Sequence, residues 1–381
     1  MKKKILIIRS NPVAPDPRVD KIAAALSEAG YEVNVLGWDR TGSLPRFEQR
    51  DSYMIERLLI RANYGAGLGN LPQLIRWQFG LFAWLISHLR TFDSIHACDF
   101  DTIVPAYLCK LFWHKKVVYD IFDFYADHLR RTPDWINNII RGIDLKIINR
   151  VDAVILVDDS RKQQIARSAP RRLSIVYNSP DETSFELIHT QNRNDLYKLK
   201  IAYIGLLQKE RGIYEILQIL QRHPDWHLDI AGFGGDEDEI IKTALSIPNV
   251  IFHGRIPYRK TIELSSAADV LFATYDPVIP NHRFSSPNKL FEAMMLGKPI
   301  IVAKNTNMDK IVAEQESGLV VNYGDVQEFE GALARLAENP AERLAKGKNA
   351  RKAYQSIYSW SIMKKRLIEL YADVFADTQQ D

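Results

Sequence analysis

The chain has 381 residues, of which 46% are hydrophobic and 25% charged, and its formal net charge is +3. Such a composition is ordinary for a globular protein, and the length is sufficient for two domains with separate cores. This net charge is too small to indicate nucleic acid as the partner.

The compartment is suggested by the cysteines and the apolar segments. Cys98 and Cys109 fit no disulfide or zinc framework, which favours a reducing cytosol. The lysine-rich start resembles a signal peptide, but the apolar run at 5–8 is too short for one. No stretch reaches the roughly 20 apolar residues of a transmembrane helix. We therefore expect a cytoplasmic protein, with a peripheral membrane contact left open.

The chain opens with a strand–loop–helix–strand unit. Its pattern predicts a strand at 4–9, a proline-rich loop at 10–18, a helix at 19–29 and a strand at 31–37. This succession is typical of α/β sheets, in which ligands bind at the carboxyl ends of the strands.

The same alternation continues to residue 177. We expect strands at 54–62, 92–97, 116–119, 153–157 and 174–177, and helices at 71–89, 102–113, 135–149 and after a cap at Asp159 and Ser160. The glycine-rich run 65–69 lacks the spacing of a dinucleotide fingerprint and predicts a flexible loop. The helix 71–89 is rich in aromatic residues. We expect these residues to pack in the core, and the alternative is that they form a surface that faces a membrane or the acceptor.

Two of these strands end in polar clusters, at 96–101 and 120–123. Asp99 and Asp101 have the Asp-x-Asp spacing of metal-dependent sugar transferases. Asp101 stands just before a helix, however, and is more simply an N-cap, so we expect no metal site.

A polar, turn-rich segment at 188–198 predicts a linker, after which the α/β pattern restarts. We expect strands at 199–204, 226–231, 250–252, 270–274, 300–303 and 319–321, with helices between them and a final amphipathic helix at 354–376. Two successive α/β sheets imply two domains and a cleft.

The best-marked helix lies within residues 286–299. Ser286 suits the N-cap and Pro287 the first helical position. Gly297 suits a left-handed C-terminal turn, and Pro299 prevents the helix from resuming.

Lys289 and Glu292 are three residues apart and share one face of this helix. A helix N-terminus with a lysine beside it indicates a phosphate ligand. The carboxylate one turn deeper indicates ligand hydroxyl groups. The pair therefore predicts a nucleotide site, although i,i+3 pairs are also common on plain surface helices.

Residues 283–298 resemble the donor-site motif of retaining family 4 glycosyltransferases of the GT-B fold. The resemblance is to the subgroup with Ser-Pro-Asn-Lys-Leu-x-Glu before Ala-Met-x-x-Gly-Lys-Pro. Segments that agree in order and spacing lie along essentially the whole chain, at 16–19, 95–99, 119–120, 203–205, 232–234, 268–270 and 314–318.

This resemblance implies an α/β fold of two Rossmann-like, doubly wound parallel-sheet domains that face each other across a cleft. The first, 1–187, would bind the acceptor, and the second, 198–360, the nucleotide sugar. The helix at about 361–381 would cross back to the first domain.

The resemblance also implies the site residues. Glu292 would accept from ribose hydroxyls, while Lys289, Arg211 and the N–H groups after Ser286 would hold the diphosphate. The full donor-side set is Gly205, Arg211, Gly232, Gly234, Tyr258, Ser285, Ser286, Pro287, Asn288, Lys289 and Glu292. Asn11, Arg18 and Asp99 would lie on the acceptor side.

Three positions depart from the family pattern. Phe284 stands at a second glutamate, Leu206 at an arginine, and Phe122 at a histidine of the first-domain loop. Lys289 is the expected replacement for the arginine. Asp123 and His96 are the candidate catalytic replacements for the histidine, and the sequence does not decide between them.

The implied reaction moves a hexose, with retention and without a metal or other cofactor, from a UDP-sugar or GDP-sugar to an acceptor hydroxyl. The acceptor would be a sugar or lipid-linked molecule in cell-surface polysaccharide or glycolipid synthesis. The alternatives are a sugar-nucleotide 2-epimerase of the same fold and a catalytically silent nucleotide-sugar-binding or scaffold subunit. Four basic and aromatic residues could dock on a membrane: Arg76, Trp77, Arg130 and Arg131. The alternative interpretation is that they are solvated residues at helix ends.

Overall fold

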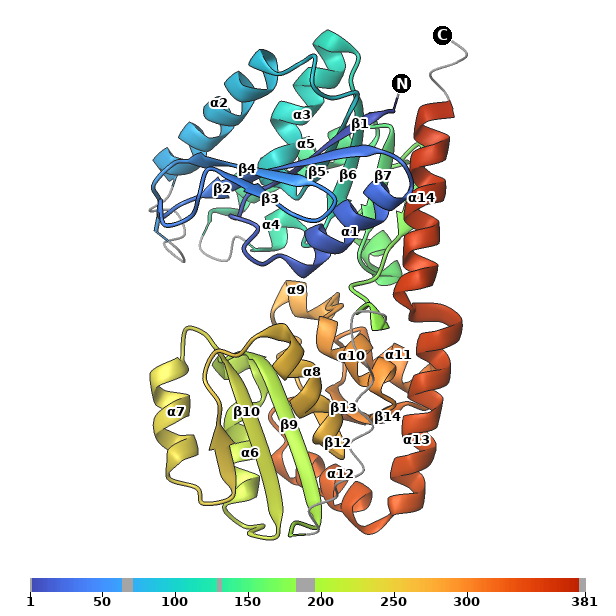
Figure 1. Ribbon diagram of the computed structural model, residues 1–381. Helices are drawn as coiled ribbons and strands as arrows, with labels where there is room; N and C mark the ends of the chain where they lie inside the picture. The colour runs from blue at the N-terminus through green and yellow to red at the C-terminus, as the bar shows by residue number, and fades with distance from the viewer. Residues whose placement is uncertain (1, 64–70, 129–131, 183–195, 377–381) are drawn as a thin grey trace. The chain divides into compact units, whose positions relative to one another are not determined.

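The computed structural model describes residues 2–63, 71–128, 132–182 and 196–376. The chain forms two compact units (Figure 1). The first comprises Met1–Tyr177 with Met363–Asp381, and the second comprises Asn178–Ile362. The chain thus passes between the units about ten residues earlier than the predicted boundary at 187. Most of the predicted linker, the glycine run 65–69 and the pair Arg130 and Arg131 lie outside the described residues.

The first unit is built on an eight-stranded sheet in the order β3-β4-β2-β1-β5-β6-β7-β8. Its strands are β1 (Lys4–Arg9), β2 (Glu32–Asp39), β3 (Phe47–Gln49), β4 (Met54–Leu59), β5 (Ser94–Cys98), β6 (Lys116–Ile121), β7 (Ala153–Leu156) and β8 (Leu173–Ile175). All neighbours pair in parallel except the edge strand β3, which runs antiparallel to β4. β3 was not predicted, because three half-exposed residues carry no periodic signal.

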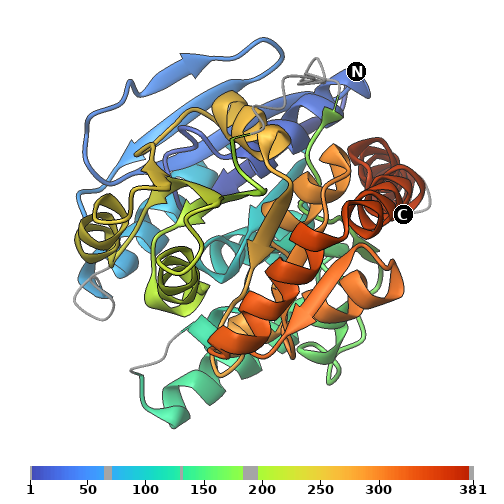
Figure 2. The same cartoon turned by 90° about the horizontal axis from the view of Figure 1, so that it is seen from below.

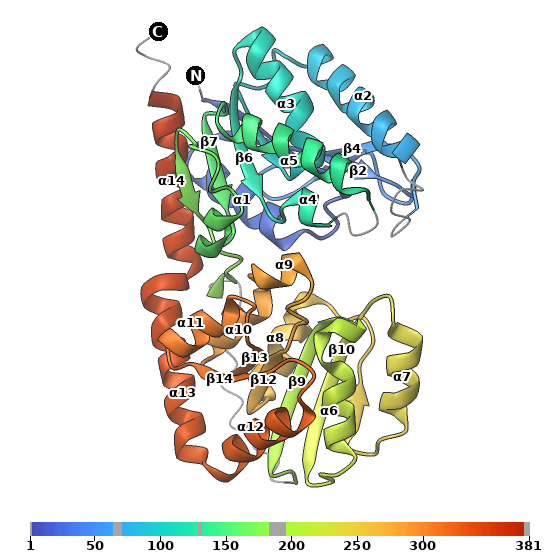
Figure 3. The same cartoon turned by 180° about the vertical axis from the view of Figure 1, so that it is seen from behind.

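Helices cover both faces of this sheet. Side chains alternate along a strand, so neighbouring residues of β5 face opposite ways. Ile95 joins the core beneath α2 (Leu71–Ser87), α3 (Phe100–Trp113) and α5 (Asp134–Ile148), which lie in front of the sheet in Figure 3. His96 faces α14 (Trp360–Ala376), on the side where Figure 1 shows α1 (Pro17–Glu28). Burial on both faces explains the continuous apolar runs of the central strands.

The second unit is built on a six-stranded parallel sheet in the order β11-β10-β9-β12-β13-β14. Its strands are β9 (Leu199–Leu206), β10 (Trp226–Phe233), β11 (Val250–Phe252), β12 (Val270–Ala273), β13 (Ile300–Ala303) and β14 (Gly318–Val321). Its helices are α6 (Ile213–Leu220), α7 (Glu237–Leu245), α8 (Tyr258–Ala267), α9 (Pro280–Arg283), α10 (Asn288–Leu296), α11 (Met308–Glu314), α12 (Val326–Glu338) and α13 (Pro340–Ala353). Helices α6 and α7 can be followed at the left of Figure 2.

The strand order of each sheet reverses at one point. In the first unit the chain builds outward from β1 on one side and from β5 on the other. In the second unit the corresponding pair is β9 and β12. At such a switch point the loops after the two strands diverge and leave a crevice, where ligands bind in open α/β sheets.

The helix starts at α10 and at Asp159 differ from prediction. α10 begins at Asn288, and Pro287 holds the cap position in an extended conformation with ψ 145°, so Ser286 is not the N-cap. Gly297 ends α10 with φ 63°, as predicted. The cap at Asp159 is replaced by Asp158, which accepts from the Ser160 N–H and starts only a 3₁₀ turn, Asp159–Gln163.

The amphipathic segment 354–376 is not one helix. A π-helical turn, Tyr354–Tyr358, follows α13, and Ser359 with ψ 150° separates it from α14. The first unit therefore contains most of α14, since Met363 and the residues after it group with the N-terminal part of the chain.

Candidate functional site

The switch point of the second unit holds a buried cation. The Lys289 Nζ atom, in the first turn of α10, lies 3.6 Å from the ring centre of Tyr203 and 5.7 Å from that of Tyr275. Within the described residues this ammonium is buried and has no hydrogen-bond partner. Burial and the neighbouring Arg211 hold the pKa of Lys289 well below its ordinary value, although Glu292 acts in the opposite direction.

A second cation lies against the same tyrosine. The Arg211 guanidinium lies over the ring of Tyr275, 4.0 Å from the ring centre. Gly212, with φ 71°, brings Arg211 there, because a Cβ atom at this position would lie 1.8 Å from Thr274 Oγ1. Two cations without a neutralising anion between them are the arrangement that a polyanionic ligand would complete.

Glycines lie where the ends of β9 and β10 come together beside Lys289. A Cβ atom on Gly205 would lie 3.0 Å from Lys289 Nζ, and one on Gly232 would lie 1.8 Å from the Gly205 carbonyl oxygen. A Cβ atom on Gly234 would lie 2.2 Å from the Leu207 carbonyl oxygen. A side chain at Gly232 or Gly234 would thus collide with the neighbouring backbone, so only glycine permits these two approaches.

Glu292 lies one turn along α10 from Lys289 and is 5% exposed. The hydroxyl group of Tyr258, the first residue of α8, donates a hydrogen bond to its carboxylate. Burial and the Glu292 charge raise the pKa of Tyr258, so this hydroxyl remains a donor. The structure thus brings Tyr258 to Glu292 itself.

The residues around the start of α10 differ in exposure. Ser285 and Ser286 are buried, Pro287 is half-buried and Asn288 is exposed. The Ser286 carbonyl oxygen accepts from Asn178 Nδ2 at 3.0 Å. Two of the residues that differ from the family pattern lie on this unit: Phe284 is half-buried and Leu206 is 41% exposed.

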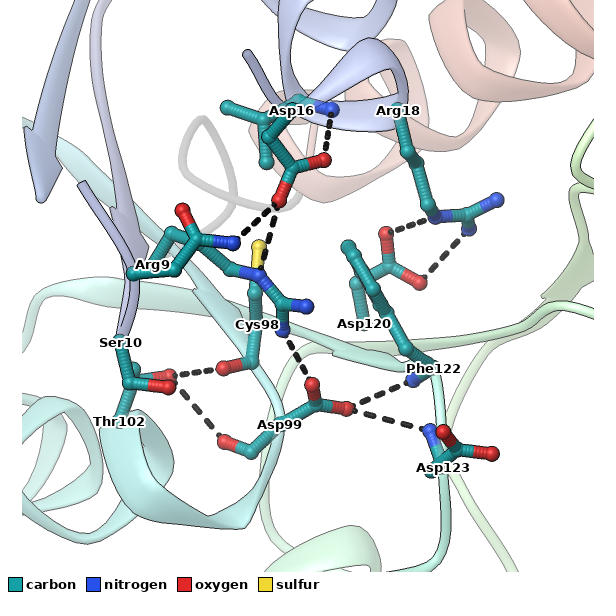
Figure 4. Close-up of polar contacts among 12 residues, drawn as sticks. Arg9, Ser10, Asp16, Arg18, Cys98, Asp99, Thr102, Asp120, Phe122 and Asp123 are labelled. Carbon is teal, nitrogen blue, oxygen red and sulfur yellow. Dashed lines mark hydrogen bonds and ion pairs between the residues drawn. The ribbon is translucent and has the colours of Figure 1, made fainter. Parts of the chain in front are cut away.

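The switch point of the first unit holds a network of ion pairs (Figure 4). Arg9, at the end of β1, donates to Asp16 at 3.1 Å and pairs with Asp99. Its guanidinium lies 4.1 Å from the ring centre of Phe122. The Arg18 guanidinium lies over the same ring at 4.9 Å. Phe122, at the family's histidine position, is therefore fixed by two cations.

Asp99 has an uncommon backbone conformation, with φ 65° and ψ 170°. Such a conformation costs on the order of 1–3 kcal/mol in a non-glycine residue and clusters at functional sites. The Asp99 carboxylate accepts from the Phe122 N–H at 2.8 Å and from the Asp123 N–H at 3.3 Å. Burial raises its pKa to about 6 against the effect of Arg9, and Asp101 and Asp123 act in the same direction as burial.

The other acceptor-side candidates divide into surface and interior groups. The Asp123 side chain is 50% exposed and pairs with Arg161 at 2.8 Å. Asn11 donates to Asp16 at 2.8 Å and accepts from the Val13 N–H, which orders the loop after β1.

His96 and Arg18 lie in the interior, around Asp120. His96 is fully buried, with Nδ1 2.8 Å from the Tyr371 hydroxyl group and Nε2 3.3 Å from Asp120. Arg18 makes two hydrogen bonds to Asp120, at 2.8 and 3.1 Å, and one to the Val176 carbonyl oxygen. These contacts are those of core side chains, so direct contact of His96 or Arg18 with a substrate does not fit the geometry.

Asp101 is not the predicted N-cap. Helix α3 begins two residues earlier than predicted, at Phe100, with Asp99 at the cap position and no side-chain capping bond. The Asp101 carbonyl oxygen instead accepts from the indole of Trp77 at 2.9 Å, and Trp77 is fully buried. Trp77 is thus a core residue and not part of a docking surface. No group of three or more metal-ligating side chains occurs in the described part of the chain.

Sequence reasoning missed Tyr203 and Tyr275, which surround the two cations. Tyr203 stands in a recognisable strand end, but its ring reaches Lys289 only because β9 and β12 are neighbours. Arg9 was missed as well, since a charged strand end carries no signal of its own. In the described residues no helix is long and apolar enough to cross a membrane.

Solved structures with the same architecture define the class of fold. Sucrose-phosphate synthase from Thermosynechococcus elongatus superposes with a TM-score of 0.81 at 18% identity, over 99% of this chain and 100% of that chain. Anabaena Alr3699/HepE in complex with UDP and glucose superposes with a TM-score of 0.72 at 16% identity, over 97% and 99%. The two Rossmann-like parallel-sheet domains are those of the GT-B fold.

Sequence comparison identifies the family. Residues 18–183 match the family described as Glycosyltransferase Family 4, and residues 184–353 match Glycosyl transferases group 1. Together these matches span most of the chain, which therefore belongs to the glycosyltransferases built from these two domains. The D-inositol 3-phosphate glycosyltransferase of Corynebacterium urealyticum is 25% identical over 336 residues, 81% of this chain and 78% of that protein.

Proposed function

We propose that this glycosyltransferase moves a hexose from a nucleoside diphosphate sugar, with UDP as the favoured nucleotide, to an acceptor hydroxyl with retention of configuration. The observation that carries the proposal is the Lys289 ammonium, which is buried at the switch point of the second unit beside Arg211 and has no hydrogen-bond partner among the described residues. Glu292 stands one turn away to accept from ribose hydroxyls.

The chemistry follows from where charge develops. As the glycosidic bond breaks, negative charge builds on the leaving β-phosphate. Lys289, Arg211 and the N–H groups at the start of α10 are fixed in advance to stabilise that charge. Two cations supply the neutralisation of the diphosphate, so the proposed step uses no metal. The departing phosphate takes the acceptor proton from the same face, and no protein nucleophile is assigned.

On the acceptor side we propose Asp123 as the group that contacts the substrate. It is the exposed carboxylate on the loop that Asp99 holds through two N–H bonds. Asp99 and Asn11 order that crevice, and His96 and Arg18 support it from the interior. The proposed acceptor is a sugar or lipid-linked molecule of cell-surface glycan synthesis, handled in the cytoplasm.

A structure of the same fold supports this choice of donor, since the Anabaena protein is in complex with UDP and glucose. The corynebacterial relative, named D-inositol 3-phosphate glycosyltransferase, supports the reaction class.

The test is calorimetric titration of UDP, GDP, ADP and NAD into the wild-type chain, Glu292→Gln and a control, Glu338→Gln, on the exposed side of α12. A charge-assisted hydrogen bond contributes about 1.5–3 kcal/mol, so Glu292→Gln is expected to weaken binding roughly ten- to a hundredfold. The control is expected to bind as wild type does. Failure of all four nucleotides to bind, or equal binding by both variants, would overturn the donor-site proposal.

The turnover assay separates the two alternatives. Transfer predicts release of free UDP that depends on an added acceptor. A 2-epimerase would convert the sugar nucleotide without an acceptor. A silent subunit, which Phe284, Leu206 and Phe122 motivate, would bind the nucleotide sugar and release nothing.

A further inference from the structure

Helix α2 carries apolar residues on a buried face and on an exposed face beside it. Trp77, Leu81 and Leu85 are fully buried against the sheet. On the other face Leu71, Ile75, Phe79 and Ile86 are 51%, 48%, 72% and 41% exposed. At 100° per residue these four positions fall within one stripe along the helix. Core packing therefore explains one face of α2 and leaves the other unexplained.

The end of helix α3 continues this stripe. Leu111, Phe112 and Trp113 are 49%, 65% and 37% exposed, and Trp113 lies against Phe82 of α2 with ring centres 6.4 Å apart. Figure 3 shows α2 and α3 side by side on the same face of the sheet. These residues define the apolar face: Leu71, Ile75, Phe79, Phe82, Ile86, Leu111, Phe112 and Trp113.

Basic residues flank the apolar face. Arg76 is the charged residue of α2 and is exposed. Arg90 follows α2 and is exposed, His114 and Lys115 follow the end of α3, and Lys110 pairs with Asp152 at 2.6 Å. Neither α2 nor the last turn of α3 has an acidic residue. Two copies of this chain that met through the face would bring like charges together, which opposes a dimer.

We infer that the apolar face docks on an anionic lipid surface. A helix with aromatic and aliphatic residues on one face and basic residues beside it lies in the plane of the bilayer interface, its side chains buried about 5–10 Å deep. Phe79 and Phe112 enter the boundary between headgroups and acyl chains, and Arg76 and Arg90 contact anionic headgroups. This assignment rests on the first unit alone and does not depend on the donor site.

The test uses the full chain and sedimentation with two kinds of vesicle, phosphatidylcholine alone and phosphatidylcholine mixed with phosphatidylglycerol. We expect binding to the anionic vesicles that weakens with added salt. The double variant Phe79→Ser and Phe112→Ser is expected to weaken binding about a hundredfold, because each phenylalanine loses its burial in lipid. Arg76→Ser with Arg90→Ser is expected to remove the preference for anionic vesicles.

The control is Leu245→Ser, which removes an apolar side chain of the second unit that is 71% exposed, and it is expected to bind vesicles as wild type does. UDP titration of every variant reports separately on folding and on the donor site. Vesicle binding that the double variant leaves unchanged, or no binding at all, would overturn the inference. A wild-type dimer in light scattering that the double variant converts to a monomer, without vesicle binding, would assign the face to a second copy instead.

Discussion

Lys289 differs from an ordinary surface lysine in what surrounds its charge. Two tyrosine rings and a glycine loop pack around the ammonium, and Arg211 repels it. Removing an ion from water costs several kcal/mol unless a partner is supplied. Burial therefore lowers the pKa of Lys289 in the unbound protein, and a bound diphosphate would raise it again.

UDP binding is therefore expected to take up a proton at Lys289. Burial lowers the pKa of this lysine, and two phosphate charges raise it, so uptake occurs at pH values between the lowered pKa and that of the complex. The measurement is the binding enthalpy in two buffers of different ionisation enthalpy. Lys289→Met is expected to abolish the buffer dependence and to weaken binding at least about tenfold. Lys348→Met, at an exposed position of α13, should change neither quantity.

Asp99, in the proposed acceptor site, has a raised pKa. Its pKa is raised to about 6, so the carboxylate is charged at neutral pH and becomes protonated as the pH falls through that value. Protonation removes the charge that faces Arg9 and weakens the bonds from the Phe122 and Asp123 N–H groups. Transfer activity is therefore expected to fall below about pH 6 through acceptor KM, while UDP affinity measured in parallel does not follow this ionisation. In Asp99→Asn the acidic limb should be absent; an unchanged limb would contradict this role.

At the scale of elements, the pairing of β9 with β10 depends on glycine at its end. Gly232 has φ 145°, and a Cβ atom there would collide with the Gly205 carbonyl oxygen at 1.8 Å. Gly232→Ala is therefore expected to lower the melting temperature and to weaken UDP binding, because the end of β9 that carries Gly205 beside Lys289 must shift.

Gly331→Ala is the matched control for this substitution. Gly331 lies in helix α12, where a Cβ atom meets nothing within 4 Å, so alanine should stabilise the chain by about 0.5–1 kcal/mol and leave UDP binding unchanged. Thermal melts and UDP titration of both variants check the pair. A Gly232→Ala variant that melts and binds as wild type does would show that this close approach is dispensable.

Elements with strong local signals could be predicted, and those set by tertiary contacts could not. The buried strands and the left-handed end of α10 follow from residue patterns and from Gly297. The start of α10 could not be placed, because Pro287 is compatible with both the first helical position and the extended residue before it. β3 and the π-helical turn at Tyr354–Tyr358 lack any periodic signature.

For the whole molecule, the sequence predicted two α/β units and the family resemblance supplied the candidate residues, but it did not rank them. Lys289, Arg211, Glu292 and Tyr258 do come together at one switch point, which strand order determines. His96 and Asp123 are equally polar in the sequence, yet one is buried in the core and the other is half-exposed. Partners distant in sequence make that difference, since Tyr371 lies 275 residues after His96.

The first unit is assembled from two separated stretches of chain, and this fixes the order of events during synthesis. The ribosome releases β1 to β8 long before it releases α14, which supplies Tyr371 to His96 and packs Phe375 against Tyr31. Until α14 is synthesised, the face of the sheet that it covers is exposed, and so is His96 on that face. The second unit, by contrast, is complete in sequence by Ile362. The residues that complete the first unit are therefore synthesised after those of the second unit.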